Sequence, residues 1–167
     1  MSSRRRTASL ALVLAATATA LTACAPIVPL EPAADANNPV CADVTVRLPD
    51  EIQSQPKRET NAQATGAWGD PENILLRCGV EVPAPSTLPC VPIDGIFWLR
   101  NDDDAPNFVF TTFGREPAVQ VAIDNDQVSA GIVLGSLSTA VATTVPNGLE
   151  CRDVEDTVTG EPGPGDE

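Results

Sequence analysis

The chain has 167 residues, of which 23 are Asp or Glu and 10 are Lys or Arg, so its formal net charge at pH 7 is −13. It contains no His, which excludes Ser-His-Asp triads, Cys-His pairs and imidazole-ligated metals. The acidic balance argues against nucleic acid as a partner, because that interaction depends on Lys and Arg displacing counterions from phosphates.

The N-terminus has the layout of a secretory signal peptide. Arg4 to Arg6 precede an uncharged, apolar stretch at residues 7–23, which is short for a membrane span of about 20 apolar residues. The stretch ends in Leu21-Thr22-Ala23-Cys24, which looks like a bacterial lipobox, in which Cys24 is lipidated and becomes the first mature residue. An ordinary signal peptide with an incidental Cys is the alternative. We therefore expect a signal peptide at 1–23 and a lipid anchor at Cys24, on the extracytoplasmic face of the cell membrane.

Residues 24–40 read as a lipidated tether rich in Pro and Ala. Such a composition favours extended chain over a packed element, and at about 3.1 Å per residue it would reach roughly 50 Å. Removing residues 1–23 takes away positive charge only, so the mature surface is more acidic and is repelled by anionic lipid head groups. The sequence therefore predicts a folded domain that stands off the membrane on its tether.

The folded segment begins at Cys41, and its first element is ambiguous. Val44 to Leu48 alternates between apolar and polar residues as a strand does. Further along, Ile74 to Val80 predicts a strand with Leu76 and Cys78 on one face and Arg77 on the other. A second strand is expected from Ile93 to Arg100.

A hairpin and a helix follow. The runs Phe108–Phe113 and Pro117–Asp124 predict two strands joined by a turn at 114–116, with Val119, Val121 and Ile123 on one face of the second strand. Residues 127–142 then place apolar side chains at helical spacing, with Asp126 as the expected helix cap.

Four cysteines, Cys41, Cys78, Cys90 and Cys151, lie in the expected folded segment. In an exported domain an even number implies disulfides, and four cysteines allow three pairings. Cys78 and Cys90 bracket a proline-heavy loop that can turn back on itself, which favours a Cys78–Cys90 bond and leaves Cys41 with Cys151. A zinc site is the alternative, but the C-x-x-C spacing and His ligands typical of one are missing.

The pattern as a whole predicts one α+β domain at 41–151. We expect a mainly antiparallel sheet of four or five strands, one or two helices on one of its faces, and two disulfides. Residues 152–167 are acidic and rich in Gly and Pro, which is typical of a disordered tail.

Several segments of the middle region form a recognisable set. They are Cys41-Ala42, Leu48-Pro49, Ala67 to Pro71, Leu76 to Val80, Cys90, Gly95 to Trp98, Thr111 to Val119 and Cys151. Together these segments resemble an actinobacterial envelope family, the domain of unknown function 3515. The resemblance implies a secreted or lipid-anchored actinobacterial protein without an established activity. It also implies a helix after the first cysteine, although Val44, Thr45 and Val46 are β-branched.

Two acidic clusters are candidate sites. Asp102, Asp103 and Asp104 supply oxygen ligands of the kind that calcium uses, but a solvated loop between two strands explains them more simply. Asp124-Asn125-Asp126 is explained by a strand end followed by a helix cap. A glycosidase would need two carboxyls about 5–10 Å apart across a sugar cleft, and a domain of this size leaves little room for one. Apart from carboxylates, the only base that could activate a nucleophilic Ser or Thr is Lys57, which is alone in a polar segment.

The remaining candidate is a binding patch made of Trp68, Arg77, Trp98 and Arg115. Arg forks bind carboxylates and Trp packs beside them, so the patch would recognise an anionic or peptide-like group. The competing interpretation pairs each Arg with a carboxylate of the chain, such as Asp70 or Glu116.

We therefore expect a non-catalytic binding or accessory module of the cell envelope, without cofactor or metal, and with a protein or cell-wall partner. The alternative is a small carboxylate-based hydrolase or a cell-wall sugar-binding protein.

Overall fold

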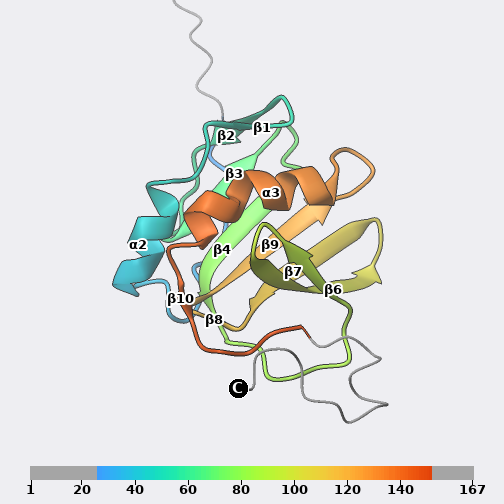
Figure 1. Ribbon diagram of the computed structural model, residues 1–167. Helices are drawn as coiled ribbons and strands as arrows, with labels where there is room; N and C mark the ends of the chain where they lie inside the picture. The colour runs from blue at the N-terminus through green and yellow to red at the C-terminus, as the bar shows by residue number, and fades with distance from the viewer. Residues whose placement is uncertain (1–25, 152–167) are drawn as a thin grey trace, which may run out of the picture.

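The computed structural model describes residues 26–151, which form a curved, eight-stranded antiparallel sheet with two helices on its inner face (Figure 1). The strand order is β1-β2-β3-β4-β9-β7-β6-β5, and β8 and β10 form a separate antiparallel pair. In chain order the elements are α2 (Pro39–Thr45), β1 (Glu51–Ile52), β2 (Gln55–Arg58), β3 (Thr65–Trp68), β4 (Ile74–Val80), β5 (Cys90–Ile93), β6 (Ile96–Asp104), β7 (Asn107–Phe113), β8 (Arg115–Glu116), β9 (Ala118–Asp124), α3 (Ala130–Val141) and β10 (Val145–Pro146).

The centre of the sheet follows the alternation of the sequence. Leu76 on β4 lies opposite Val121 on β9, which lies opposite Phe110 on β7, and all three side chains are buried against the helices. The strands expected at 74–80, 108–113 and 117–124 are therefore confirmed, as is the antiparallel pairing of the last two. The expectation of four or five strands was too low, because several additional strands are only two to four residues long.

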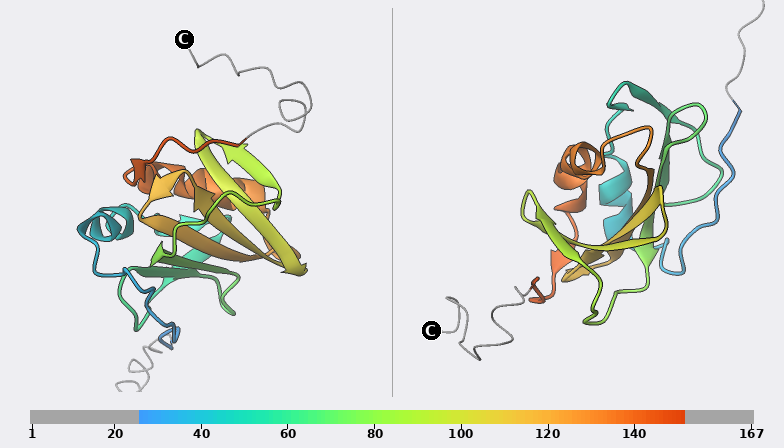
Figure 2. Two further views of the ribbon diagram at one scale, coloured as in Figure 1. Left: turned by 90° about the horizontal axis from the view of Figure 1, so that it is seen from below. Right: turned by 90° about the vertical axis from the view of Figure 1, so that its right-hand side faces the viewer.

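Both helices bury one side against the inner face of the sheet (Figure 2). In α3 the side chains of Val133, Leu134, Leu137 and Val141 are buried, as the helical spacing indicated. The N-cap is Ser129, not Asp126 as expected. The Oδ1 atom of Asp124 accepts a hydrogen bond from the backbone N–H of Asp126 at 3.0 Å, so this acidic cluster forms a turn before the helix.

The helix α2 resolves the ambiguous first element. Asn38 caps it by accepting a hydrogen bond from the backbone N–H of Val40 at 3.0 Å, and Pro39 stands at its start, where a missing N–H costs nothing. Cys41 and Val44 share the buried side of the helix. The helix implied by the family resemblance is confirmed, and the strand pattern at Val44 to Leu48 was misleading.

The domain begins well before Cys41, so the tether expected at 24–40 is wrong for residues 26–40. Val28 is 3% exposed and its N–H donates to the carbonyl of Glu59 at 2.9 Å. Further on, the N–H of Asp35 donates to the carbonyl of Gly79 at 3.0 Å. This segment runs along the outer side of the sheet (Figure 2). Residues 26–36 are therefore packed on the sheet in spite of their content of Pro and Ala, and we call them the N-terminal strap. Cys24, the signal peptide and the tail at 152–167 lie outside the described residues.

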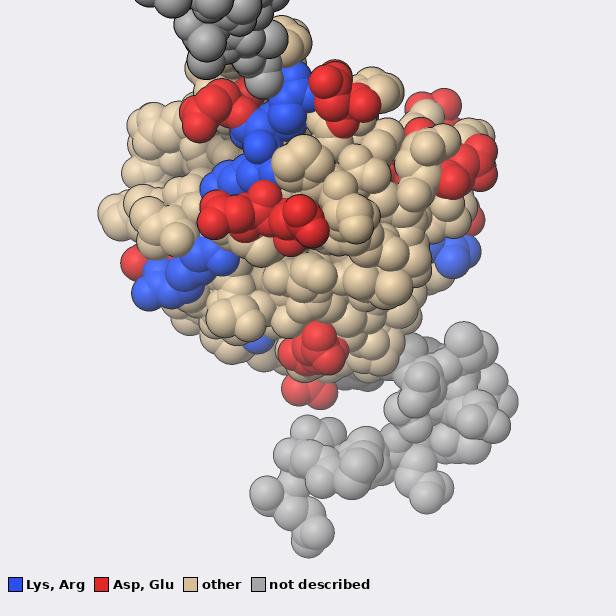
Figure 3. All heavy atoms as spheres, turned by 90° about the horizontal axis from the view of Figure 1, so that it is seen from above, with Lys and Arg blue, Asp and Glu red and all other residues tan. Residues whose placement is uncertain are grey.

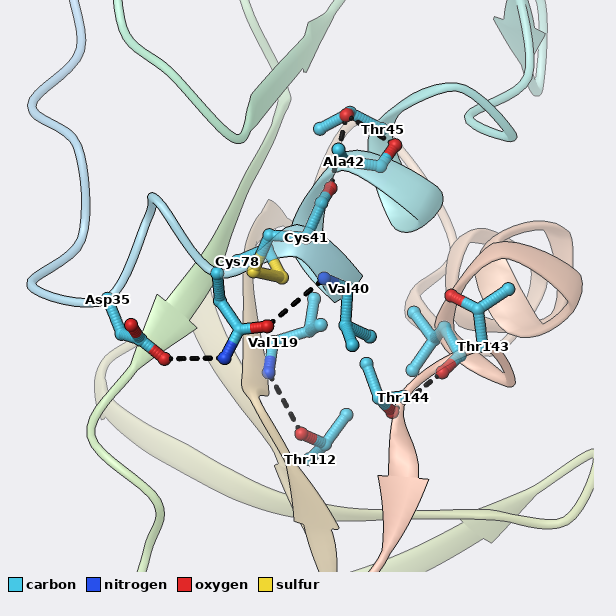
Figure 4. Close-up of a disulfide and its surroundings, with 12 residues drawn as sticks. Asp35, Val40, Cys41, Ala42, Thr45, Cys78, Thr112, Val119, Thr143 and Thr144 are labelled. Atoms are coloured by element: carbon cyan, nitrogen blue, oxygen red, sulfur yellow. Dashed lines mark hydrogen bonds between the residues drawn. A yellow bond between two sulfur atoms is a disulfide. The ribbon is translucent and has the colours of Figure 1, made fainter.

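One disulfide joins Cys41 to Cys78 (Figure 4), and the other joins Cys90 to Cys151, so the expected pairing is also wrong. Cys78 is on β4 and Cys90 is on β5, with β9, β7 and β6 between them in the sheet. At about 4.8 Å per strand this separates the two residues by about 19 Å along the sheet, whereas a disulfide needs Cα atoms within about 7 Å. The proline-heavy loop crosses the sheet instead of closing on itself.

Candidate binding site

The outer face of the sheet carries a polar row beside an apolar one. Across β4, β9 and β7, Arg77 lies opposite Gln120, which lies opposite Thr111. One step along the strands, Leu75, Ala122 and Val109 make the neighbouring row. All of these side chains are half-buried, and no helix of the described chain covers them.

The N-terminal strap turns part of this face into a hollow. Leu30 and Glu31 stand over β4 and β9, and their side chains enclose a cavity of about 130 Å³ with those of the sheet. The strap is held there because the backbone N–H of Leu30 donates to Oδ1 of Asn61 at 2.7 Å. The full lining is Leu30, Glu31, Leu75, Arg77, Gln120 and Ala122.

Arg77 is the cation of this hollow. Its Nη2 donates to Oε1 of Gln120 at 2.5 Å, and Nε2 of Gln120 in turn donates to Oγ1 of Thr111 at 3.4 Å. Arg47, Arg58 and Arg100 each form an ion pair with an Asp, whereas Arg77 has no carboxylate of residues 26–151 within ion-pair distance.

The alternative interpretation, in which Arg77 and Arg115 pair with Asp70 or Glu116, is not what the structure shows. Asp70 pairs with Arg58, at 3.2 Å, rather than with Arg77. Arg115 lies on β8, where its Nη1 donates to the carbonyl of Thr144 at 2.8 Å, and it does not line the hollow. Within the described range it has no ion pair with Glu116. Desolvation by burial lowers the pKa of Arg115 below its usual range.

The two tryptophans of the expected patch belong to the core. Trp68 and Trp98 are both 0% exposed and face the helices. The indole Nε1 of Trp68 donates to the carbonyl of Pro49 at 2.9 Å, which satisfies its polar atom inside the protein. Of the four residues of the expected patch, only Arg77 contributes to the hollow.

Sequence reasoning missed the other lining residues for two different reasons. Leu75, Gln120 and Ala122 occupy the outward positions of strands that the alternation did identify, so knowledge of the strand order would have placed them beside Arg77. Leu30 and Glu31 carried no such signal, because their segment reads as extended chain.

The acidic clusters do not converge on a metal site. In the β6–β7 hairpin, Asp102 pairs with Arg100 at 3.1 Å and Asp103 accepts a hydrogen bond from Nδ2 of Asn101 at 3.1 Å. Over residues 26–151 no group of three or more His, Cys, Asp or Glu side chains is arranged to hold a metal ion. A second, open and mainly polar hollow of about 360 Å³ lies before α3, lined by Gln53, Asn125, Asp126, Gln127, Val128 and Ser129.

Neither described helix is long and apolar enough to cross a membrane. No curated protein and no solved structure matches the chain. A family model does match it, over residues 7–149, and that range includes both the helices and all of the strands described above. The chain belongs to the family described as protein of unknown function (DUF3515).

Proposed function

We propose that the protein is a lipid-anchored, non-catalytic binding module of the actinobacterial cell envelope, and that the hollow at Arg77 receives the free carboxylate of a peptide. Cys24 supplies the anchor in this proposal. The ligand comes from an envelope protein or from the peptide part of the cell wall, which share this chemistry.

The observation that carries the proposal is that Arg77 forms no ion pair with a carboxylate of residues 26–151. The chain has a formal charge of −13, yet this half-buried guanidinium has no carboxylate partner among residues 26–151. Gln120 orients one edge of it from the neighbouring strand. A guanidinium oriented in this way can bind a planar anion, because its remaining N–H groups match the two oxygens of a carboxylate.

The other walls restrict the ligand further. Leu75 and Ala122 offer an apolar floor beside the guanidinium, on which the carbon atoms of a peptide can pack. Glu31 adds a negative charge on the strap side, which disfavours a second anionic group and favours an amine. A cavity of about 130 Å³ is smaller than the roughly 300–1,000 Å³ of small-molecule pockets, so it suits one chain end rather than a whole cofactor.

The hydrolase alternative has no comparable support. Glycoside hydrolysis needs two carboxyl groups facing one bond at about 5–10 Å. Among residues 26–151, Glu31 is the one carboxylate that lines the hollow, and its neighbours there are apolar, amide or guanidinium groups.

The test compares Arg77→Gln with Arg47→Gln, a variant with the same change in charge. Arg47 is exposed, pairs with Asp43 and does not line the hollow, so it serves as the matched control. Peptide fragments of the cell wall and synthetic peptide C-termini are titrated against the oxidised protein by calorimetry, each as free acid and as amide.

We expect Arg77→Gln to weaken binding of the free acids by about tenfold or more, since a hydrogen bond to a charged group contributes about 1.5–3 kcal/mol. Arg47→Gln should bind as the parent does, and amidation should weaken binding to the parent. Equal affinity of parent and Arg77→Gln, or of acid and amide, would overturn the proposal. Mass spectrometry of the mature N-terminus, with Cys24→Ala as control, tests lipidation separately.

A further inference from the structure

Arg58 fixes Pro26, at the start of the strap, to the sheet. Its side chain is 7% exposed and pairs with Asp70 at 3.2 Å. Its Nη1 donates to the carbonyl of Gly69 at 2.8 Å, and its Nη2 donates to the carbonyl of Pro26, also at 2.8 Å. One buried guanidinium thus joins the start of the strap to the end of β3.

The strap continues in contact with the sheet from this point. The buried Val28 forms a parallel bridge with Thr60, and its carbonyl accepts a hydrogen bond from the backbone N–H of Asn61 at 3.4 Å. These contacts lie next to Arg58 in sequence, so strap and sheet form one body at this end of the domain.

The chain between the proposed anchor at Cys24 and the packed domain is therefore short. Cys24 is two residues before Pro26, and two residues of fully extended chain span at most about 7 Å. The tether of roughly 50 Å that composition suggests is not available, because residues 26–36 are engaged along the sheet.

We infer that the domain lies directly on the membrane surface, with the end formed by Pro26, Ile27 and the β1–β2 hairpin in contact with the lipid head groups. This inference rests on the proposed lipidation of Cys24. Ile27 is 61% exposed beside the clamped Pro26, which places an apolar side chain where the head groups would be.

The charged side chains around β1 and β2 indicate which interactions hold the domain on the membrane. Figure 3 looks at the end that carries β1 and β2 and shows Lys and Arg side chains flanked by Asp and Glu. On and beside these strands the exposed Lys57 is accompanied by the exposed Glu51 and Glu59. The surface is not a basic patch, so the lipid and the clamped strap hold the domain, and docking does not require anionic lipid.

The test measures energy transfer from the protein's tryptophans to dansyl-labelled head groups in vesicles of neutral phosphatidylcholine. Trp68 is a suitable donor because it lies opposite Lys57 in the β2–β3 pair. The chain from Cys24 to Glu167 is coupled to a maleimide lipid through Cys24, the one cysteine outside the two disulfides. This coupling makes the result independent of lipidation in cells, so failure of this inference and failure of the proposed anchor are distinguishable.

The decisive variant inserts about twelve Gly and Ser residues between Ala25 and Pro26, which adds about 20 Å of flexible chain and leaves every described contact in place. The control carries the same insert after Glu167. We expect the N-terminal insert to reduce transfer at least twofold and the C-terminal insert to leave it unchanged. Equal transfer with and without the N-terminal insert would overturn the inference, as would a several-fold loss of transfer in high salt.

Discussion

Gly79 decides whether the N-terminal strap can lie on β4. Its φ angle is +89°, and a Cβ atom there would come within 2.4 Å of the backbone carbonyl carbon and oxygen of Asp35. We predict that Gly79→Ala lowers the free energy of unfolding by about 2–5 kcal/mol, from left-handed strain of about 1–2 kcal/mol and overpacking of about 1–3 kcal/mol. Urea unfolding of the oxidised protein measures this change.

Gly95→Ala is the matched control for Gly79→Ala. The φ angle of Gly95 is +76°, but a Cβ atom there would have no neighbour within 4 Å. This variant should therefore lose only the strain of about 1–2 kcal/mol. Equal losses at the two glycines would mean that the strap does not press on Gly79.

The hydroxyl of Thr112 completes the hydrogen bonding of β9. Thr112 is 0% exposed, and its Oγ1 accepts a hydrogen bond from the backbone N–H of Val119 at 2.9 Å (Figure 4). We predict that Thr112→Val lowers the free energy of unfolding by about 1–3 kcal/mol, because a buried N–H loses its partner. Thr111→Val, on the half-buried outer face, should cost less, and thermal unfolding of both variants compares them. The same loss at both positions would contradict this role of Thr112.

At the level of the elements, sequence predicted those whose burial repeats over seven or more residues. The strands β4 and β9 and the helix α3 were recognisable because one side of each is buried along most of its length, and β7 was recognisable as a run of strand-forming residues. The strand β3 was not, since all four of its residues, Thr65 to Trp68, are buried and show no alternation. Trp68 was therefore expected in a binding patch, whereas it is 0% exposed.

The disulfide pairing and the hollow could not be predicted, because both depend on strand order. Neighbours in sequence such as Cys78 and Cys90 are separated by three strands, whereas Arg77 and Gln120 are adjacent in the sheet. Alternation assigns a residue to a face of its own strand but does not say which strand lies beside it. The strap was missed for a related reason, since its few buried residues, such as Val28 and Ala36, do not form a periodic pattern.

The disulfide pairing predicts the outcome of a single cut in the loop between β4 and β5. Residues 81–89 contain no strand and are mostly exposed, so a specific protease site can replace Ala84 to Leu88. Because each disulfide lies on one side of this loop, the cut chain should separate into two fragments on a denaturing gel without reductant. A Cys78–Cys90 bond with a Cys41–Cys151 bond would hold the fragments together until reductant is added.

On the scale of the whole molecule, the strap has three roles. It follows Cys24, the proposed anchor, it closes one side of the hollow with Leu30 and Glu31, and it covers part of the outer face of the sheet. Glu31 is seven residues after Cys24, a distance of at most about 25 Å in extended chain. With Cys24 as the proposed lipid anchor, the proposed ligand of Arg77 would therefore be bound close to the membrane rather than deep in the cell wall.

A chain that begins at Ala34 tests this joint role. It loses the buried Val28, worth about 1.5–3 kcal/mol, and leaves Arg58 without the carbonyl of Pro26. We predict a loss of about 3 kcal/mol in the free energy of unfolding relative to a chain that begins at Cys24, together with weaker peptide binding, measured by urea unfolding and calorimetry. Unchanged stability would mean that residues 26–33 act as a tether. Lower stability with unchanged binding would mean instead that the strap supports the sheet without forming the site, and the ligand would then contact Arg77 from the open side of the face.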